Sequence, residues 1–411
     1  MTSRERVLAA INHKETGRVA VDLSGHRSSG MSAIVYPKLR AALGLERRPV
    51  YVYDPVQQLS IIDNDVLDRF GIDTIEMGRG FCLEDEWWAD WTLPDGTPCK
   101  MPVWALPERD GAGWRLRSKQ GPVLARMPEG ALHFDQIHWP FFGVQEDLTK
   151  IPEALESSMW SVFGSPPGAA PLNDAERAAG AKQLRKSTNR AIIGLFGGNL
   201  LELGQMLYRM DEFLVMLAGE PARAHRFLDA LVEMHLQNLE TFLGTVGPYI
   251  DVILFGDDLG AQNCPQISPR MYKEFFQPRH KMMWARAKEL ADVKVMLHCC
   301  GAVRPLLPLL IEAGLDAINP VQISSRGMEA EGLKRDFGAD LCFWGGGCDT
   351  QRLLPEGRPA EIREHVLRQC AVMAPGGGFV FQQVHNIMAN VPAENVIAMF
   401  DAVAEFNAAG A

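Results

Sequence analysis

The sequence predicts an α/β protein, specifically a (β/α)8 (TIM) barrel with a β-rich insertion near residues 80–140. From about residue 175 onward, short apolar runs alternate with amphipathic helical stretches, the pattern of βα units on a parallel sheet. The runs are apolar at nearly every position, which is typical of strands buried on both faces. Eight such runs can be counted along the chain, and that number favours a barrel over an open doubly wound sheet.

The predicted strands are short and rich in β-branched or aromatic residues. They cover residues 18–25, 71–78, 191–197, 251–258, 293–300, 315–322, 341–348 and 378–385. Apolar residues recur with helical spacing between several of them, which predicts helices over 220–243, 268–290 and 303–314. Residues 1–15 also predict a short amphipathic helix.

The region 80–140 differs from the rest because apolar and polar residues alternate in it. Asp95-Gly96 and Gly111-Ala112-Gly113 are hairpin signals within this region. We expect the insertion to lie over one mouth of the barrel, within a single domain that spans residues 1–411. Its tryptophans predict either packing of the insertion onto the barrel or an aromatic wall for a substrate or partner; they are Trp87, Trp88, Trp91, Trp104 and Trp114.

Composition and charge exclude several classes of protein. The 411 residues are 47% hydrophobic and 22% charged, as in an ordinary globular protein. The net charge of -10 is spread without a basic run, so we expect no nucleic-acid partner. No segment approaches the roughly 20 apolar residues of a membrane span, and no targeting peptide is evident, so a cytoplasmic location is expected. The eight cysteines are then better explained as reduced thiols or metal ligands than as disulfides.

Metal-binding side chains follow two of the predicted strands. Residues i and i+2 of an extended segment point to the same side, so His298 and Cys300 can converge, and Cys348 follows another strand. Two thiolates and an imidazole suit zinc, and three protein ligands leave a fourth position for a substrate. The alternative is that the histidine is a hydrogen-bonded core residue and the cysteines are small core fillers.

Other polar residues follow the same strand ends, where the active sites of such barrels lie. We predict catalytic roles for Asp257, Asp258 and His385, the aspartates as general acid or base, partner of a substrate cation or further zinc ligand. The alternative for the aspartates is that they cap a turn and hold a loop. Predicted substrate-binding residues are Asp22, His26, Gln262, Asn263, Gln383 and Asn386, some of which could equally form a satisfied structural network.

Several segments resemble the uroporphyrinogen decarboxylase superfamily, and within it the branch of zinc-dependent, cobalamin-linked methyltransferases. The resemblance is carried by RERVLAAINHKETGRVAVDL near the N-terminus, residues 256–283 and 295–322, and FWGGGCDTQ followed by PGGGFVFQQVHNI. It implies that His298, Cys300 and Cys348 bind Zn2+. It also implies methyl or alkyl transfer between a small methylated substrate, or a thiol, and a corrinoid (cobalamin) supplied free or by a separate corrinoid protein.

The resemblance has one clear departure, and two other functions remain open. The arginine-rich N-terminal segment with which the decarboxylases grip substrate carboxylates is reduced here to Arg27. The first alternative is nevertheless a metal-independent decarboxylase that uses one of the aspartates. The second, from another class, is a barrel with a structural zinc ion whose tryptophan-rich insertion binds a protein partner.

Overall fold

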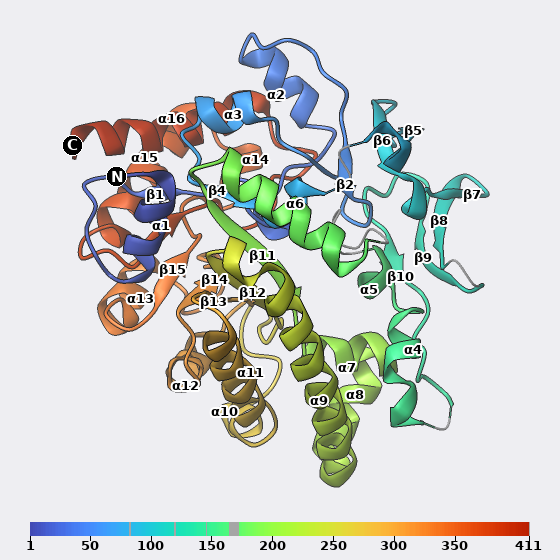
Figure 1. Ribbon diagram of the computed structural model, residues 1–411. Coiled ribbons are helices and arrows are strands. Elements are labelled where there is room, and N and C mark those ends of the chain that lie inside the picture. Colours follow the sequence, from blue (N-terminus) through green and yellow to red (C-terminus); the bar gives the residue numbers. More distant parts are fainter. Residues whose placement is uncertain (82–83, 119–120, 145, 164–171, 411) are drawn as a thin grey trace.

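The barrel strands form one parallel sheet in a computed structural model that describes residues 1–81, 84–118, 121–144, 146–163 and 172–410 (Figure 1). In spatial order they are β1 (Ala20–Val21), β16 (Phe379–Phe381), β15 (Cys342–Trp344), β14 (Ala317–Asn319), β13 (Lys294–His298), β12 (Val252–Gly256), β11 (Ala191–Gly197) and β4 (Thr74–Glu76). Each lies within one of the eight predicted strands, so the predicted (β/α)8 barrel is confirmed.

The two end strands of this sheet, β1 and β4, are joined by the residue that precedes β4. The backbone N–H of Asp73 donates to the Val21 carbonyl over 2.8 Å, and the Asp73 carboxylate accepts from the Val21 N–H over 3.0 Å. A side chain therefore supplies part of the pairing that a longer strand would supply, and the barrel closes.

Alternate residues of the strands fill the barrel interior and face the helices. The interior cluster includes Val252 and Leu254 of β12, whereas Ile253 and Phe255 face outward. Helix α1 (Ser3–Ile11) adds three side chains to the same interior cluster, namely Val7, Ala10 and Ile11. This helix closes the end of the barrel at which the strands begin.

Helices surround the barrel and connect its strands (Figure 1). Those that follow barrel strands are α7 (Leu201–Tyr208), α8 (Met210–Gly219), α9 (Pro221–Val246), α10 (Pro269–Met271), α11 (Gln277–Leu290), α12 (Leu307–Glu312), α13 (Ala330–Phe337), α14 (Leu353–Glu356), α15 (Pro359–Met373) and α16 (Ala393–Ala409). A π-helical turn, Tyr272–Phe276, interrupts the predicted helix 268–290. The remaining helices are α2 (Tyr36–Ala42), α3 (Asn64–Arg69), α4 (Ile151–Leu155), α5 (Met159–Phe163) and α6 (Asp174–Ser187).

The predicted β-rich insertion lies to one side of the barrel strands (Figure 1). Its strands are β5 (Trp88–Thr92), β6 (Pro98–Pro102), β7 (Glu108–Asp110), β8 (Gly113–Arg117), β9 (Val123–Met127) and β10 (Asp135–Gln136). Both predicted hairpins form, with β5 pairing antiparallel to β6 and β7 to β8. A short pair outside the barrel, β2 (Val52–Asp54) and β3 (Leu59–Ser60), precedes the insertion.

The tryptophans of the insertion contribute to packing. Trp87 meets Trp104 edge to face with ring centroids 5.8 Å apart, and Trp91 meets Trp114 at 5.1 Å. The insertion shares a hydrophobic cluster with residues 33–56 and 159–163, separate from the two clusters of the barrel. Within the described ranges, no helix is both long and apolar enough to cross a membrane.

Candidate active site at the carboxyl ends of the strands

A cavity of about 640 Å³ opens at the carboxyl ends of the barrel strands. Its lining comes from the ends of β4, β11, β12 and β13, from the segments that follow β1 and β16, and from helices that include α6 and α9. None of the described residues between 84 and 154 lines it, so the insertion tryptophans form no wall of this cavity. The aromatic lining instead includes Trp160 of α5, Phe196 of β11 and Phe255 of β12.

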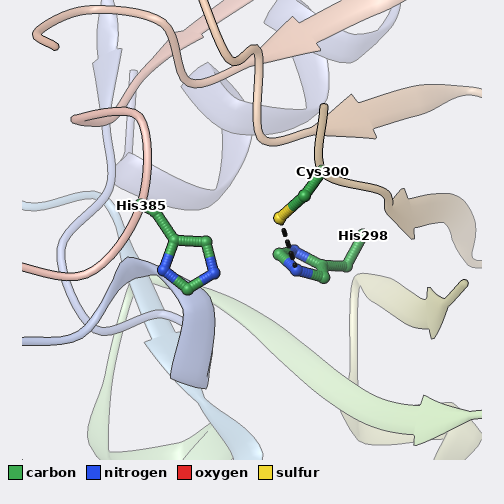
Figure 2. A group of neighbouring side chains, drawn as sticks. All are labelled: His298, Cys300 and His385. Carbon is green, nitrogen blue, oxygen red and sulfur yellow. Dashed lines mark hydrogen bonds between the residues drawn. The ribbon is translucent and has the colours of Figure 1, made fainter. Parts of the chain in front are cut away.

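Three metal-ligating side chains lie close together at the carboxyl ends of the strands (Figure 2), and two of them, His298 and His385, line the cavity. His298, Cys300 and His385 each offer one ligand atom, and these atoms lie within 4.8 Å of one another. The Cys300 Sγ lies 3.5 Å from the His298 Nε2, and the two imidazole centroids are 5.4 Å apart. Cys299, between the first two, points away and accepts a hydrogen bond from the Leu259 N–H through its sulfur.

A chain of hydrogen bonds behind His298 determines which of its ring nitrogens carries the proton. The Gln382 Nε2 donates to the Ser28 carbonyl, so its Oε1 must accept from the Asn319 Nδ2 over 2.7 Å. The Asn319 Oδ1 is therefore free to accept from the His298 Nδ1, which lies 2.9 Å away. Since the proton is on Nδ1, a neutral His298 presents an unprotonated Nε2 toward Cys300.

Burial governs the ionisation of this group. Burial, together with the charges of His298, His26 and Arg27, lowers the pKa of His385 to about 3, so its ring is neutral at pH 7. Burial and the neighbouring Asp258 carboxylate raise the pKa of the Cys300 thiol. A neutral imidazole is the form that binds metals, whereas a thiol must lose its proton to do so.

The structure does not bring Cys348 into this group. Cys348 follows Gly345 and Gly346, whose φ angles are 111° and 79°, and these values end the extended backbone of β15. Its side chain is buried in the hydrophobic cluster outside the barrel, and its sulfur contacts the Asp349 carbonyl at 3.9 Å. The geometry therefore favours His385, which the sequence suggested as a catalytic group, as the third ligand.

The two aspartates after β12 point in opposite directions. Asp257 is fully buried, and its carboxylate accepts hydrogen bonds from the N–H groups of Leu201 and Glu202 at the start of α7. Asp258 lines the cavity and accepts from the Cys300 N–H over 2.7 Å. Asp257 thus has the capping role that was the alternative prediction for these residues. Only Asp258 is placed to meet a substrate.

Asp22 and His26 lie beneath the cavity, outside its lining. The Asp22 carboxylate accepts hydrogen bonds from Trp344 Nε1 and Thr74 Oγ1, and His26 Nε2 lies 3.4 Å from it. Burial alone would raise the pKa of Asp22, but the hydrogen bonds from these neighbours hold it below its usual value. Neither Asp22 nor His26 is therefore placed to contact a ligand in this cavity.

The remaining predicted substrate-binding residues do not line the cavity. Gln383 and Asn386 are buried and bind the segment after β1, through the Ser29 carbonyl and the Gly30 N–H. Gln262 and Asn263 are exposed, and Gln262 bonds the Ser324 carbonyl on a neighbouring loop. None of the four is therefore placed to contact a ligand in this cavity.

Three carboxyls that line the cavity were not among the predicted site residues: the exposed Asp174, and Glu76 and Glu202. Glu76 ends β4 and is only 4% exposed, and Glu202 lies in the first turn of α7. Glu76 could have been found, because it follows Thr74 on the inward face of a predicted strand. Glu202 carried no such signal. It lies in a helix that follows a loop, so the alternation of side chains along the preceding strand does not predict its direction.

Glu76 should make the stability of the protein depend on pH. Burial raises its pKa from the ordinary 4.5 to about 8, so the stability present below pH 4.5 is lost as the pH rises toward 8. We expect Glu76→Gln to gain stability relative to the parent chain across this window, by at most about 1.4 kcal/mol per pH unit. Urea unfolding at several pH values measures this, with the exposed Glu129→Gln as control. A stability difference that does not change with pH would contradict the expectation.

The fold and the cavity define a (β/α)8-barrel protein with a candidate site at the carboxyl ends of its strands. The family model for uroporphyrinogen decarboxylase (URO-D) matches residues 178–406, more than half of the chain. The chain therefore belongs to the uroporphyrinogen decarboxylase family.

Solved structures support the fold. A methyltransferase from Methanosarcina mazei is similar with a TM-score of 0.56 and 16% identity over 99% of each chain, a likeness that shows the fold. D-psicose 3-epimerase, solved in the presence of D-fructose, matches with a TM-score of 0.34 and 12% identity over 57% of this chain and 83% of its own. That score is too low to bear on either fold or function. No curated protein matches the chain.

Proposed function

We propose that the protein is a zinc-dependent methyl or alkyl transferase in which His298, Cys300 and His385 hold the metal. The observation that carries the proposal is the meeting of these three side chains beside a cavity that is large enough for a small molecule and is lined by His298 and His385. The structural neighbour described as a methyltransferase supports it at the level of fold. The other substrate of the transfer would be a corrinoid, supplied free or by a separate protein.

The donor set fits zinc on chemical grounds. Imidazole nitrogen and thiolate sulfur are its preferred protein ligands, and three such ligands leave a position open. Zinc bound there would supply Lewis acidity that ionises a thiol or polarises the heteroatom carrying a methyl group. The hydrogen-bonded Asn319 fixes the ring of His298, as partners of metal-binding histidines generally do.

Other residues of the site would bind and shield the small substrate. Leu195 and Leu254 form an apolar wall on the side of the barrel interior, and Trp160 lies beneath the guanidinium of Arg27 at 4.9 Å from its ring centroid. This cation–π contact holds the guanidinium of Arg27 at the cavity. The apolar walls would exclude water from the reacting atoms.

The test is zinc analysis combined with X-ray absorption at the zinc edge, with and without a small thiol such as 2-mercaptoethanol. We expect one zinc per chain with one sulfur and two imidazole nitrogens from the protein, and one more sulfur after the thiol is added. A protein that binds no zinc, or a zinc whose ligands do not respond to thiol, would overturn the proposal.

A metal-independent decarboxylase is the second candidate, favoured by the family description. It would release carbon dioxide in the presence of a chelator, and Asp258 would be the carboxylate that meets the substrate. If a chelator abolishes the release of carbon dioxide, the decarboxylase is excluded. If the release resists the chelator but is lost in Asp258→Asn, the decarboxylase becomes the preferred function.

A further inference from the structure

Glu202 is a partly buried carboxyl that lines the same cavity as His298 and His385, two of the three candidate metal ligands. Its backbone N–H is held by Asp257, so the start of α7 is fixed against the end of β12. Its Oε2 accepts a hydrogen bond of 2.6 Å from Asn199. The carboxylate also accepts a hydrogen bond from the Asp258 backbone, and these attachments position it at the cavity wall.

The surroundings of Glu202 contain acids and thiols rather than cations. Burial, followed by the charges of Asp258 and Asp257, raises the pKa of Glu202 to about 8. On the neighbouring strand end Cys300 belongs to the candidate metal site whereas Cys299 points away from it, and the charge of Glu202 contributes to the rise in the pKa of both thiols. No salt bridge to Glu202 is found within the described ranges. At pH 7 the carboxyl is therefore mostly protonated.

We propose that Glu202 is the catalytic acid of this site, which gives a proton to the heteroatom that loses its methyl group. The inference rests on the proposed function. It also narrows the substrate class, because a proton donor serves donors whose leaving group is a poor anion, such as methyl ethers and thioethers. A methylated sulfonium or ammonium donor leaves as a neutral molecule and needs no proton.

The step balances without a further reactant. The bond between the heteroatom and the methyl carbon breaks, and its electron pair remains on the heteroatom. That atom takes the proton of Glu202 and becomes a hydroxyl or thiol. The methyl group passes to a reduced corrinoid, whose cobalt supplies the electron pair of the new bond and is formally oxidised from Co(I) to Co(III). Glu202 is left as a carboxylate and regains its proton from water, and in the reverse direction it accepts the proton.

The experiment compares the zinc-loaded parent protein with Glu202→Gln, which keeps the size of the side chain. Methyl aryl ethers whose phenols span several pKa units are the donors, and cob(I)alamin, followed by its absorption spectrum, is the acceptor. We expect the variant to lose on the order of 10²- to 10⁴-fold in rate with the least acidic phenols and far less with the most acidic. An equal loss for every donor would overturn the proposal, because it would indicate a structural role.

Two further measurements separate this proposal from the proposed function. Infrared difference spectra between the parent and Glu202→Gln at pH 7 should show the carbonyl band of a protonated carboxylic acid, whether or not any donor is turned over. Absence of that band overturns the role of Glu202. Glu76→Gln removes another buried cavity carboxyl and is expected to change the rates of all donors by one common factor. If the parent transfers methyl from no donor although the band is present, the proposed function fails instead.

Discussion

Replacement of Cys300 by serine is expected to lower zinc affinity by more than 100-fold and to reduce methyl transfer to the background rate. A neutral hydroxyl is a much poorer zinc ligand than a thiolate, and the described part of the chain brings only three ligating side chains together here. The loss should exceed the roughly 10- to 100-fold that follows removal of an outer partner. Competition with a chromophoric chelator measures the affinity.

The control for this variant is Cys348→Ser. The Cys348 side chain is buried away from the three ligands, so zinc affinity should stay within a few-fold of that of the parent. His385→Ala should behave like Cys300→Ser, because the imidazole is the third member of the group. If Cys348→Ser loses zinc while His385→Ala keeps it, the ligand set expected from the sequence is right and the one favoured by the geometry is wrong.

Replacement of Asn319 by alanine is expected to lower zinc affinity by about 10- to 100-fold, although Asn319 lies behind the ligands. Alanine removes the acceptor of the His298 Nδ1 proton, so the ring can rotate or shift its proton to Nε2. Nε2 is the nitrogen that faces Cys300. The same chelator competition measures the effect.

Asn319→Asp is the matched comparison for this prediction. The aspartate keeps an acceptor for His298 but loses the donor to the Trp344 carbonyl and to Gln382. We expect it to retain more zinc affinity than the alanine variant. Equal losses in the two variants, with unchanged thermal unfolding of both, would show that the ring of His298 is oriented by something else.

The alternation of residues along the strands explains which parts of the site could be predicted from the sequence. In β13 the interior residue Met296 is followed at even positions by His298 and Cys300, and the parity continues past the strand end. The same rule separates Asp258 in the cavity from Asp257 behind it. Wherever the backbone stays extended, the sequence pattern therefore gives both the strand and the direction of its side chains.

The rule fails where the backbone stops being extended. In β15 the side chains of Cys342 and Trp344 point into the barrel, so strict alternation predicts that Cys348 does too. The positive φ angles of Gly345 and Gly346 interrupt that alternation. After β16 an irregular segment carries His385 into the cavity. Glycine reveals only that such a turn is permitted, so the direction of the chain beyond it depends on packing that the sequence does not display.

Helix α1 makes the barrel accessible from one end only. Its apolar side chains fill the amino-end opening, and salt bridges from Arg4 to Asp251 and from Arg6 to Asp73 fasten it to the bases of β12 and β4. Under the proposed function, a small donor and a protein that carries the corrinoid would therefore both reach the site from the opposite end of the barrel. A bound partner would then cover the opening and retain the donor during the proposed transfer. The demethylated product could leave only after the partner had dissociated.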